Sequence, residues 1–263
     1  MRLENIIMDY KQIIELVRQA GQLVFDRELK ENVQAKCPTD FVTAVDLGIS
    51  NFLKEELHRL EPEIAFMSEE EEGVPTEARW ILDPIDGTTN LVYDYNMSSV
   101  SLAYFDGTQV TFGVIYNPFC GDLFVAKAGE GAYLNGVRLG VAPDRELGNC
   151  LIEFGAGVTW KQYVDESFAL AKEVFENCLD LRRICSSAIA VAYIAAGKLN
   201  GYFERVLKPW DYAAASLMLR ECGCVCSDWD GNPIQYEHPT TFVCGTPKAY
   251  QYLYETIQKH RQF

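Results

Sequence analysis

The feature that most restricts how this chain can fold is the segment WILDPIDGTTN at residues 80–90. An apolar run leads directly into Asp83 and Asp86, which stand three residues apart around a proline, and a glycine follows them. Proline and glycine favour the end of a strand and a turn, which would aim both carboxylates and the main-chain carbonyl of Ile85 at one point. Hard divalent cations bind such oxygen atoms, so the segment indicates a metal site.

The residues after this turn favour an anion beside the metal. Thr88, Thr89 and Asn90 are expected to open a short helix, whose free N–H groups and positive dipole end suit phosphate. Asp-Pro and Asp-Gly pairs occur in many turns that bind nothing. The seven fixed letters of DPxDGTTN, however, would recur by chance only about once in a billion positions at average residue frequencies. We therefore interpret the segment as functional.

This string resembles the first signature of the inositol monophosphatase family, part of a larger group of magnesium-dependent, lithium-sensitive phosphatases. Further motifs of that family follow the same order here: Lys36 ahead of FVTAVD at residues 41–46, the pair Glu69-Glu70 before the first signature, and PWDYAAA at residues 209–215. Together these motifs extend over nearly the whole chain.

The chain departs from the family pattern inside the motifs. Leu91 and Tyr93 stand where the family usually has an aromatic residue and often a histidine, and Cys224 follows Gly223 where a second glycine is usual. None of these positions is expected to contact a metal. The departures affect the rim of the substrate pocket and local packing, while the reaction class is expected to be unchanged.

The resemblance implies an α+β fold, the layered α-β-α-β-α sandwich of the sugar phosphatases. We expect one phosphatase domain over residues 1–263, with an antiparallel meander in a half of about 1–145 and a mixed sheet with helices in a half of about 146–263. The implied enzyme is a Mg²⁺-dependent phosphomonoesterase that hydrolyses inositol monophosphates, such as myo-inositol 1-phosphate, through a metal-activated water. Two to three Mg²⁺ ions and a homodimer are part of the same expectation.

The matching family positions also imply roles for individual residues. The implied metal ligands are Glu69, Asp83, the main-chain carbonyl of Ile85, Asp86 and Asp211. Thr88, hydrogen-bonded to Asp46, would orient and deprotonate the attacking water together with Glu69. Asp211 is expected in the first turn of a helix that begins at a proline.

The resemblance implies substrate contacts as well. The main-chain N–H groups of Asp86, Gly87 and Thr88 would hold phosphate oxygens, and Lys36 would attract the phosphate. On the leaving-group side, the implied contacts are Ser186, Ser187 and Glu204. Glu70 extends the acidic run of Glu69 and is expected to be dispensable, because charge runs are usually solvated faces.

Other functions remain open from the sequence. Within the phosphatases, the alternatives are fructose 1,6-bisphosphatase, 3'-phosphoadenosine phosphate or NADP phosphatase, and histidinol phosphatase, and the letters TTN favour the inositol phosphatases among them. In another class, the chain would be a regulatory, RNA-polymerase-associated protein that keeps the fold. Four intact carboxylates argue for retained catalysis, because a disused site has no need to hold like charges together.

Composition restricts the compartment and the partners. The chain has 263 residues with 48% hydrophobic content, enough for a substantial core, and no apolar run reaches the roughly 18 residues of a membrane helix. The N-terminus lacks the basic and apolar regions of a signal peptide, so we expect a cytoplasmic protein without a membrane partner. The formal net charge of −15 argues against direct nucleic-acid binding, which needs basic patches.

The nine cysteines are expected to stay reduced in that compartment, as small buried residues. Cys222, Cys224 and Cys226 alternate as on one face of a strand. A zinc site is not expected, because no second cluster at ligand spacing completes a set of four ligands.

Hydrophobic periodicity predicts the remaining elements. In the first half we expect an amphipathic helix within residues 4–30 and another after a capping box formed by Thr43 and Asp46. Strands are expected at residues 64–68, 80–82, 99–104, 110–116 and 123–126, the last three as a meander. In the second half the expected strands are 151–154, 201–204 and two near Val225 and Phe242, and the expected helices are 164–177, 186–196 and 209–222.

Overall fold

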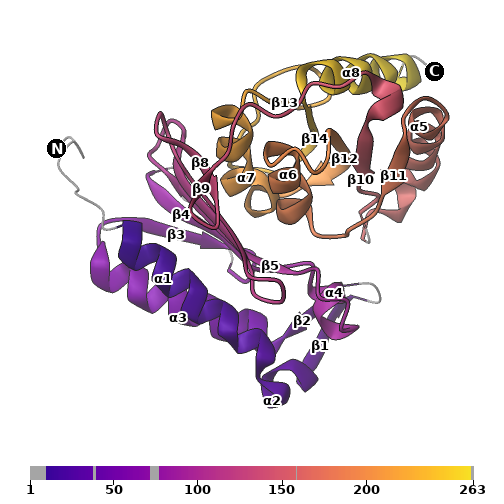
Figure 1. Cartoon of the computed structure of the whole chain (residues 1–263). Coiled ribbons are helices and arrows are strands. Elements are labelled where there is room, and N and C mark those ends of the chain that lie inside the picture. Colours follow the sequence, from indigo (N-terminus) through magenta and orange to yellow (C-terminus); the bar gives the residue numbers. More distant parts are fainter. Residues whose placement is uncertain (1–9, 38–39, 72–76, 158, 262–263) are drawn as a thin grey trace.

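The computed structural model describes residues 10–37, 40–71, 77–157 and 159–261, and its elements stack as alternating helical and sheet layers (Figure 1). The helices are α1 (Tyr10–Gly21), α2 (Arg27–Glu31), α3 (Ala44–Leu60), α4 (Thr88–Val92), α5 (Val164–Asn177), α6 (Ser187–Ala195), α7 (Pro209–Glu221) and α8 (Pro247–Arg261). The α-β-α-β-α sandwich expected from the sequence is confirmed.

The strands form two large sheets and one hairpin. The hairpin pairs β1 (Val33–Cys37) with β2 (Asp40–Thr43). The seven-stranded sheet has the spatial order β3 (Ala65–Ser68), β4 (Arg79–Asp86), β5 (Ser99–Phe105), β6 (Val110–Asn117), β7 (Asp122–Lys127), β8 (Gly131–Leu134) and β9 (Val137–Arg138). The five-stranded sheet has the order β11 (Asp180–Arg182), β10 (Leu151–Phe154), β12 (Gly201–Leu207), β14 (Thr240–Gly245) and β13 (Val225–Ser227).

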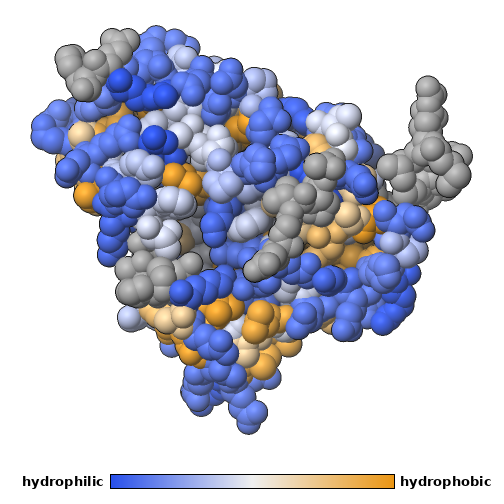
Figure 2. All heavy atoms as spheres, turned by 180° about the vertical axis from the view of Figure 1, so that it is seen from behind, coloured by the Kyte–Doolittle hydropathy of each residue, from blue (hydrophilic) through white to orange (hydrophobic). Residues whose placement is uncertain are grey.

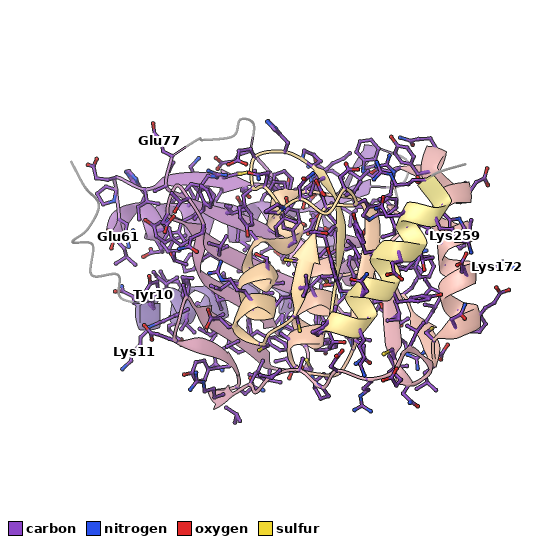
Figure 3. All side chains as sticks on the ribbon, turned by 90° about the horizontal axis from the view of Figure 1, so that it is seen from above. Tyr10, Lys11, Glu61, Glu77, Lys172 and Lys259 are labelled. Atoms are coloured by element: carbon purple, nitrogen blue, oxygen red, sulfur yellow. The ribbon has the colours of Figure 1, made fainter. Side chains whose placement is uncertain are left out.

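Helices cover both faces of each large sheet. Helices α1 and α3 pack on one face of the seven-stranded sheet, and α6 and α7 fill the space between the two sheets. Helices α5 and α8 close the outer face of the five-stranded sheet. Figure 3 shows this order from above, with Tyr10 and Glu61 of the α1 and α3 layer near one end and Lys172 and Lys259 of the outer helices near the other.

The local signals in the sequence account for several of these elements. Thr43 caps α3 by accepting from the N–H of Val45 and of Asp46, and the Asp46 carboxylate accepts in return from the Thr43 N–H at 2.8 Å. The expected meander is present as the antiparallel pairs β5·β6 and β6·β7. Helix α5 has the predicted bounds, and α7 begins at its proline.

Three expectations were wrong in detail. The helix expected within residues 4–30 is interrupted, because the Asp26 side chain accepts from the N–H groups of Glu28 and Leu29 and starts α2 anew, while residues 1–9 lie outside the described part. Pro84 does not end β4, since a register shift between Asp83 and Asp86 admits it within the strand. The alternating cysteines do not share one strand, since Cys222 closes α7 and only Cys226 lies in β13.

The hydropathy of the surface differs from place to place. Figure 2 shows hydrophilic residues over most of one face, with hydrophobic ones in separate patches. Among the described residues, no helix combines the length and apolar character needed to cross a membrane.

Helix α7 packs against the seven-stranded sheet with a close approach of its backbone to β6 at Gly113. Ala213, Ala214 and Ala215 are buried and small, and Gly113 of β6 faces the backbone of Ala214. A Cβ atom at Gly113 would lie 2.8 Å from the main-chain oxygen of Ala214. The fit therefore depends on a missing side chain in the sheet and small ones on the helix.

We predict that Gly113→Ala lowers the free energy of unfolding by about 1–3 kcal/mol, because the added methyl group overpacks against the backbone of α7. Alanine in place of glycine would otherwise slightly favour a strand. Gly140→Ala is the matched control, because a Cβ there meets nothing within 4 Å. Urea denaturation of both variants decides it, and equal midpoints for Gly113→Ala and wild type would contradict this view of the core.

Candidate active site

Three carboxylates converge where the two halves of the chain meet. Asp83 and Asp86 come from the end of β4 and Asp211 from the first turn of α7, and one oxygen of each lies within 4.8 Å of the others. Glu69 directly follows β3, and its N–H donates to the main-chain oxygen of Leu82 at 3.2 Å. This hydrogen bond holds Glu69 next to the part of β4 that carries Asp83. The predicted metal-ligand side chains are therefore gathered in one region.

Asp86 and Asp211 are each held in place by hydrogen-bond donors. Asp86 accepts from the start of α6, from the Ser186 hydroxyl, the Ser187 N–H at 3.0 Å and the Ala188 N–H at 2.9 Å. Asp211 accepts from the Lys208 N–H at 2.7 Å. Helix α6 thus orients a carboxylate that belongs to the opposite sheet.

Asp83 differs from its neighbours. It is only 2% exposed, and its Oδ1 atom is buried without a hydrogen-bond partner among the described residues. A buried carboxylate oxygen left without a partner is costly unless a cation or a donor meets it. The all-oxygen donor set around that atom fits a hard divalent cation such as Mg²⁺.

Electrostatics support the same fit. Burial, followed by the negative charge of Glu69, raises the pKa of Asp83 and of Asp211 well above the ordinary value. Burial also raises the pKa of Asp86 to about 6, although the hydrogen bonds from α6 oppose the rise. With no cation between them, these carboxylates repel one another in a poorly solvated place. A bound divalent cation would remove that repulsion.

The predicted contact between Thr88 and Asp46 is present. The Thr88 hydroxyl lies 3.2 Å from Asp46 Oδ1 and 3.1 Å from the main-chain oxygen of Ile85, so it can donate to either. Burial raises the pKa of Asp46 to about 6, against hydrogen bonds from Thr43 that lower it. Gly87 precedes α4 with a φ of 88°, a left-handed conformation that glycine adopts without strain.

Lys36 also lies where the sequence predicts, near the cluster. It is part of β1, and its ammonium nitrogen is 2.7 Å from Glu70 Oε1 and 3.5 Å from Glu69 Oε1. Glu70 thus pairs with a lysine, and neither Glu69 nor Glu70 belongs to the group formed by Asp83, Asp86 and Asp211.

A cavity of about 190 Å³ opens beside the carboxylates, with Glu69 and Asp211 on its wall. The predicted leaving-group residues Ser186, Ser187 and Glu204 line it too. The Ser186 hydroxyl donates a hydrogen bond to Asp86, which leaves its lone pairs as acceptors for a ligand in the cavity.

Glu204 is tightly held in the wall of this cavity. Its Oε1 atom accepts from the Gly157 N–H at 2.9 Å, and its Oε2 atom accepts from the Tyr202 hydroxyl, which lies 3.2 Å from the Ser187 hydroxyl oxygen. Burial raises the pKa of Glu204 to about 7. The carboxylate is fixed in position, and its remaining lone pairs can accept hydrogen bonds from a ligand.

The sequence did not point to Glu153 or Lys208 as residues of the site. Glu153 is buried in the cavity wall and accepts from the Ile184 N–H at 2.6 Å, and Asn90 donates to the main-chain oxygen of Ile184 at 2.8 Å. The side chains of Glu153 and Asn90 thus hold the backbone of Ile184, which lies just before α6, from both its N–H and its carbonyl group. Lys208 lines the cavity as well, and its place three residues before Asp211 was the one signal that could have revealed it.

None of the residues that depart from the family motifs lines the cavity beside the carboxylates. Leu91 is fully buried in the core beneath the seven-stranded sheet, and Tyr93 is 73% exposed. Cys224 packs against the core between the sheets.

Comparison with known proteins agrees with this geometry. The model of the inositol monophosphatase family matches residues 8–262. Among curated proteins, the Nus factor SuhB of Escherichia coli K12 is 34% identical over 242 residues, which cover 90% of each chain.

Solved structures share the whole fold. The extragenic suppressor protein suhB of Bartonella henselae aligns with a TM-score of 0.87 and 30% identity over 96% of this chain and 99% of that one. An IMPase of Thermotoga maritima aligns with a TM-score of 0.87 and 26% identity over 97% and 99%. The family model and the full-length relatives agree with the motifs, and the chain belongs to the inositol monophosphatase family.

Proposed function

We propose that the protein is a Mg²⁺-dependent phosphomonoesterase that hydrolyses inositol monophosphates of the myo-inositol 1-phosphate type to inositol and phosphate. The observation that carries this proposal is the buried oxygen of Asp83, which has no hydrogen-bond partner among the described residues and belongs to a carboxylate cluster beside a cavity. Family membership supports the reaction class. The name IMPase of the Thermotoga maritima relative supports the substrate class.

The residues that would hold the metal are Glu69, Asp83, the Ile85 carbonyl, Asp86 and Asp211. Two to three Mg²⁺ ions bound there would supply Lewis-acid stabilisation of the charge on phosphate and lower the pKa of water. Asp86 is kept in position by α6, and Asp211 by the Lys208 N–H, so little reorganisation is needed when the substrate binds.

Other residues of the chain would act on the water and on the phosphate. The Thr88 hydroxyl, in contact with Asp46, can accept a hydrogen bond from the attacking water and pass its own proton toward Asp46. Glu69 would share in this deprotonation. The N–H groups of Gly87 and Thr88, with that of Asp86, would donate to phosphate oxygens, and Lys36 would add positive charge nearby.

The leaving group would occupy the cavity on the side of Glu204. A polyol presents hydroxyl donors, and the Glu204 carboxylate offers acceptors fixed by Tyr202 and Gly157. Ser187 would contribute a further hydroxyl, while Ser186 acts through Asp86. We also propose that the enzyme works as a homodimer on a small-molecule substrate, as the family resemblance implies. A cytoplasmic location is a further part of the proposal.

The direct test is release of phosphate from a panel of substrates, with and without Mg²⁺. We expect activity on inositol 1-phosphate to exceed that on fructose 1,6-bisphosphate, 3'-phosphoadenosine phosphate, NADP and histidinol phosphate, and to vanish in chelator because the cluster then lacks its cations. Full activity after chelation and dialysis would contradict the metal assignment. A better rate on another member of the panel would move the substrate assignment to that compound.

A second prediction separates Asp83 from Glu70. Asp83→Asn removes charge at the partnerless oxygen of the cluster, so turnover should fall on the order of a thousandfold, comparable to loss of a key transition-state contact. Glu70→Gln is the matched control, since Glu70 pairs with Lys36 outside the cluster, and it should change turnover little. Steady-state kinetics of both variants measure this, and similar losses in the two would mean that the ligands are misassigned.

A second candidate function follows from the name of the relatives, Nus factor SuhB. It is a regulatory role in association with RNA polymerase, which the net charge of −15 permits if the contact is with protein and not with nucleic acid. Purified RNA polymerase applied to immobilised wild type and Asp83→Asn distinguishes the candidates. Retention by both proteins without any phosphatase activity of the wild type would favour regulation, and no retention would remove this candidate.

A further inference from the structure

Lys208 is a cation placed by the same helix start that places Asp211. Its N–H donates to Asp211 Oδ2 at 2.7 Å, and its ammonium nitrogen lies 5.2 Å from the centroid of the Trp210 ring. The side chain lines the cavity together with Glu69 and Asp211. The backbone of Lys208 is thus tied to Asp211, and its ammonium group lies 3.7 Å from Glu69 Oε1, another residue of the cavity wall.

The two lysines near Glu69 are in different electrostatic situations. The ammonium of Lys36 is 2.7 Å from Glu70 Oε1, a charge-assisted hydrogen bond, and Lys36 is not among the residues that line the cavity. The ammonium of Lys208 is 3.7 Å from Glu69 Oε1, which is too long for a hydrogen bond, and it makes no side-chain hydrogen bond with the described residues. Lys208 therefore has three N–H donors with no acceptor in that part of the chain.

We propose that Lys208 binds the phosphate group of the substrate and of the inorganic phosphate product. The inference rests on the proposed function, because it takes Glu69 to be engaged by a divalent cation. Once the carboxylates are neutralised in this way, the ammonium of Lys208 is a positive charge without a counterion at the mouth of the cavity. A compact ammonium on a flexible stem is a suitable point-charge donor for a phosphate oxygen.

A simpler role for Lys208 makes a different prediction. If the lysine only neutralised Glu69, its removal would relieve competition with the metal, so Mg²⁺ would bind more tightly and phosphate would bind as before. If it binds phosphate, its removal weakens phosphate binding at saturating Mg²⁺. The two roles are separated by titrating the metal and the anion independently.

The test uses the full-length protein and three variants. Lys208→Met removes the charge and keeps much of the stem, and Lys208→Arg keeps the charge. Lys198→Met is the control, because Lys198 also pairs with a carboxylate, Asp122 at 3.0 Å, and lies 4.2 Å from the Tyr193 ring centroid. Lys198 follows the C-terminal end of α6, roughly 13 Å along the helix from the site.

Calorimetric titration with inorganic phosphate at saturating Mg²⁺ gives the answer. We expect Lys208→Met to bind phosphate about tenfold more weakly, the size of one charge-assisted hydrogen bond, with a similar rise in KM for a phosphomonoester. Lys208→Arg should recover most of the affinity, and Lys198→Met should match wild type. Unchanged phosphate affinity in Lys208→Met, an equal loss in Lys198→Met, or no phosphate binding by wild type would each overturn the proposal.

Failure of this inference is distinguishable from failure of the proposed function. If the wild type hydrolyses phosphomonoesters and Lys208→Met binds phosphate normally, only the proposed role of Lys208 is wrong. If the wild type releases no phosphate from any substrate but binds phosphate in a Lys208-dependent way, the proposed enzymatic function is wrong and the contact between Lys208 and phosphate is confirmed.

Discussion

Mutual repulsion among Asp83, Asp86 and Asp211 is the constraint on which the rest of the structure depends. Three carboxylates with oxygens inside 4.8 Å of one another cannot all be charged in a buried place without compensation. The protein supplies part of it through the start of α6 on Asp86 and the Lys208 N–H on Asp211. Among the described residues, none donates a hydrogen bond to the Oδ1 atom of Asp83, so that oxygen is open to a cation.

Helices α6 and α7, which lie between the two large sheets, hold these carboxylates in place. Helices α6 and α7 bury small residues against the seven-stranded sheet, and Gly113 lets α7 approach β6 closely. Their N-terminal ends then meet the end of β4, one supplying donors and the other a carboxylate. Because α6 and α7 also pack toward the five-stranded sheet, that sheet can carry Glu204 and Glu153 to the same cavity. Packing of small side chains therefore determines the distances between charged ones.

The sequence predicted best where signals are local. The capping box of Thr43 and Asp46, the proline that opens α7 and the alternation of the meander were all visible in the chain, and the family motifs identified the carboxylates. Strand β4 continued through Pro84 because a register shift, which no local signal announces, accommodates it. Helix α8 was missed, since its buried stripe of Ala249, Leu253 and Ile257 is interleaved with polar and tyrosine residues. Contacts such as those of Glu153 and Lys208 depend on tertiary distances, which spacing along the chain does not encode.

The central claim is that the carboxylate cluster is a cation site, and anomalous diffraction from crystals grown with Mn²⁺ in place of Mg²⁺ tests it most directly. We expect anomalous peaks next to Asp83, with Asp86, Asp211 and Glu69 as neighbours. The distance from each peak to a carboxylate oxygen should be roughly 2.0–2.2 Å, which is typical of small hard cations. It also predicts weaker peaks in Asp83→Asn crystals. A well-ordered cluster with no peak at Asp83 in saturating Mn²⁺ would contradict the account.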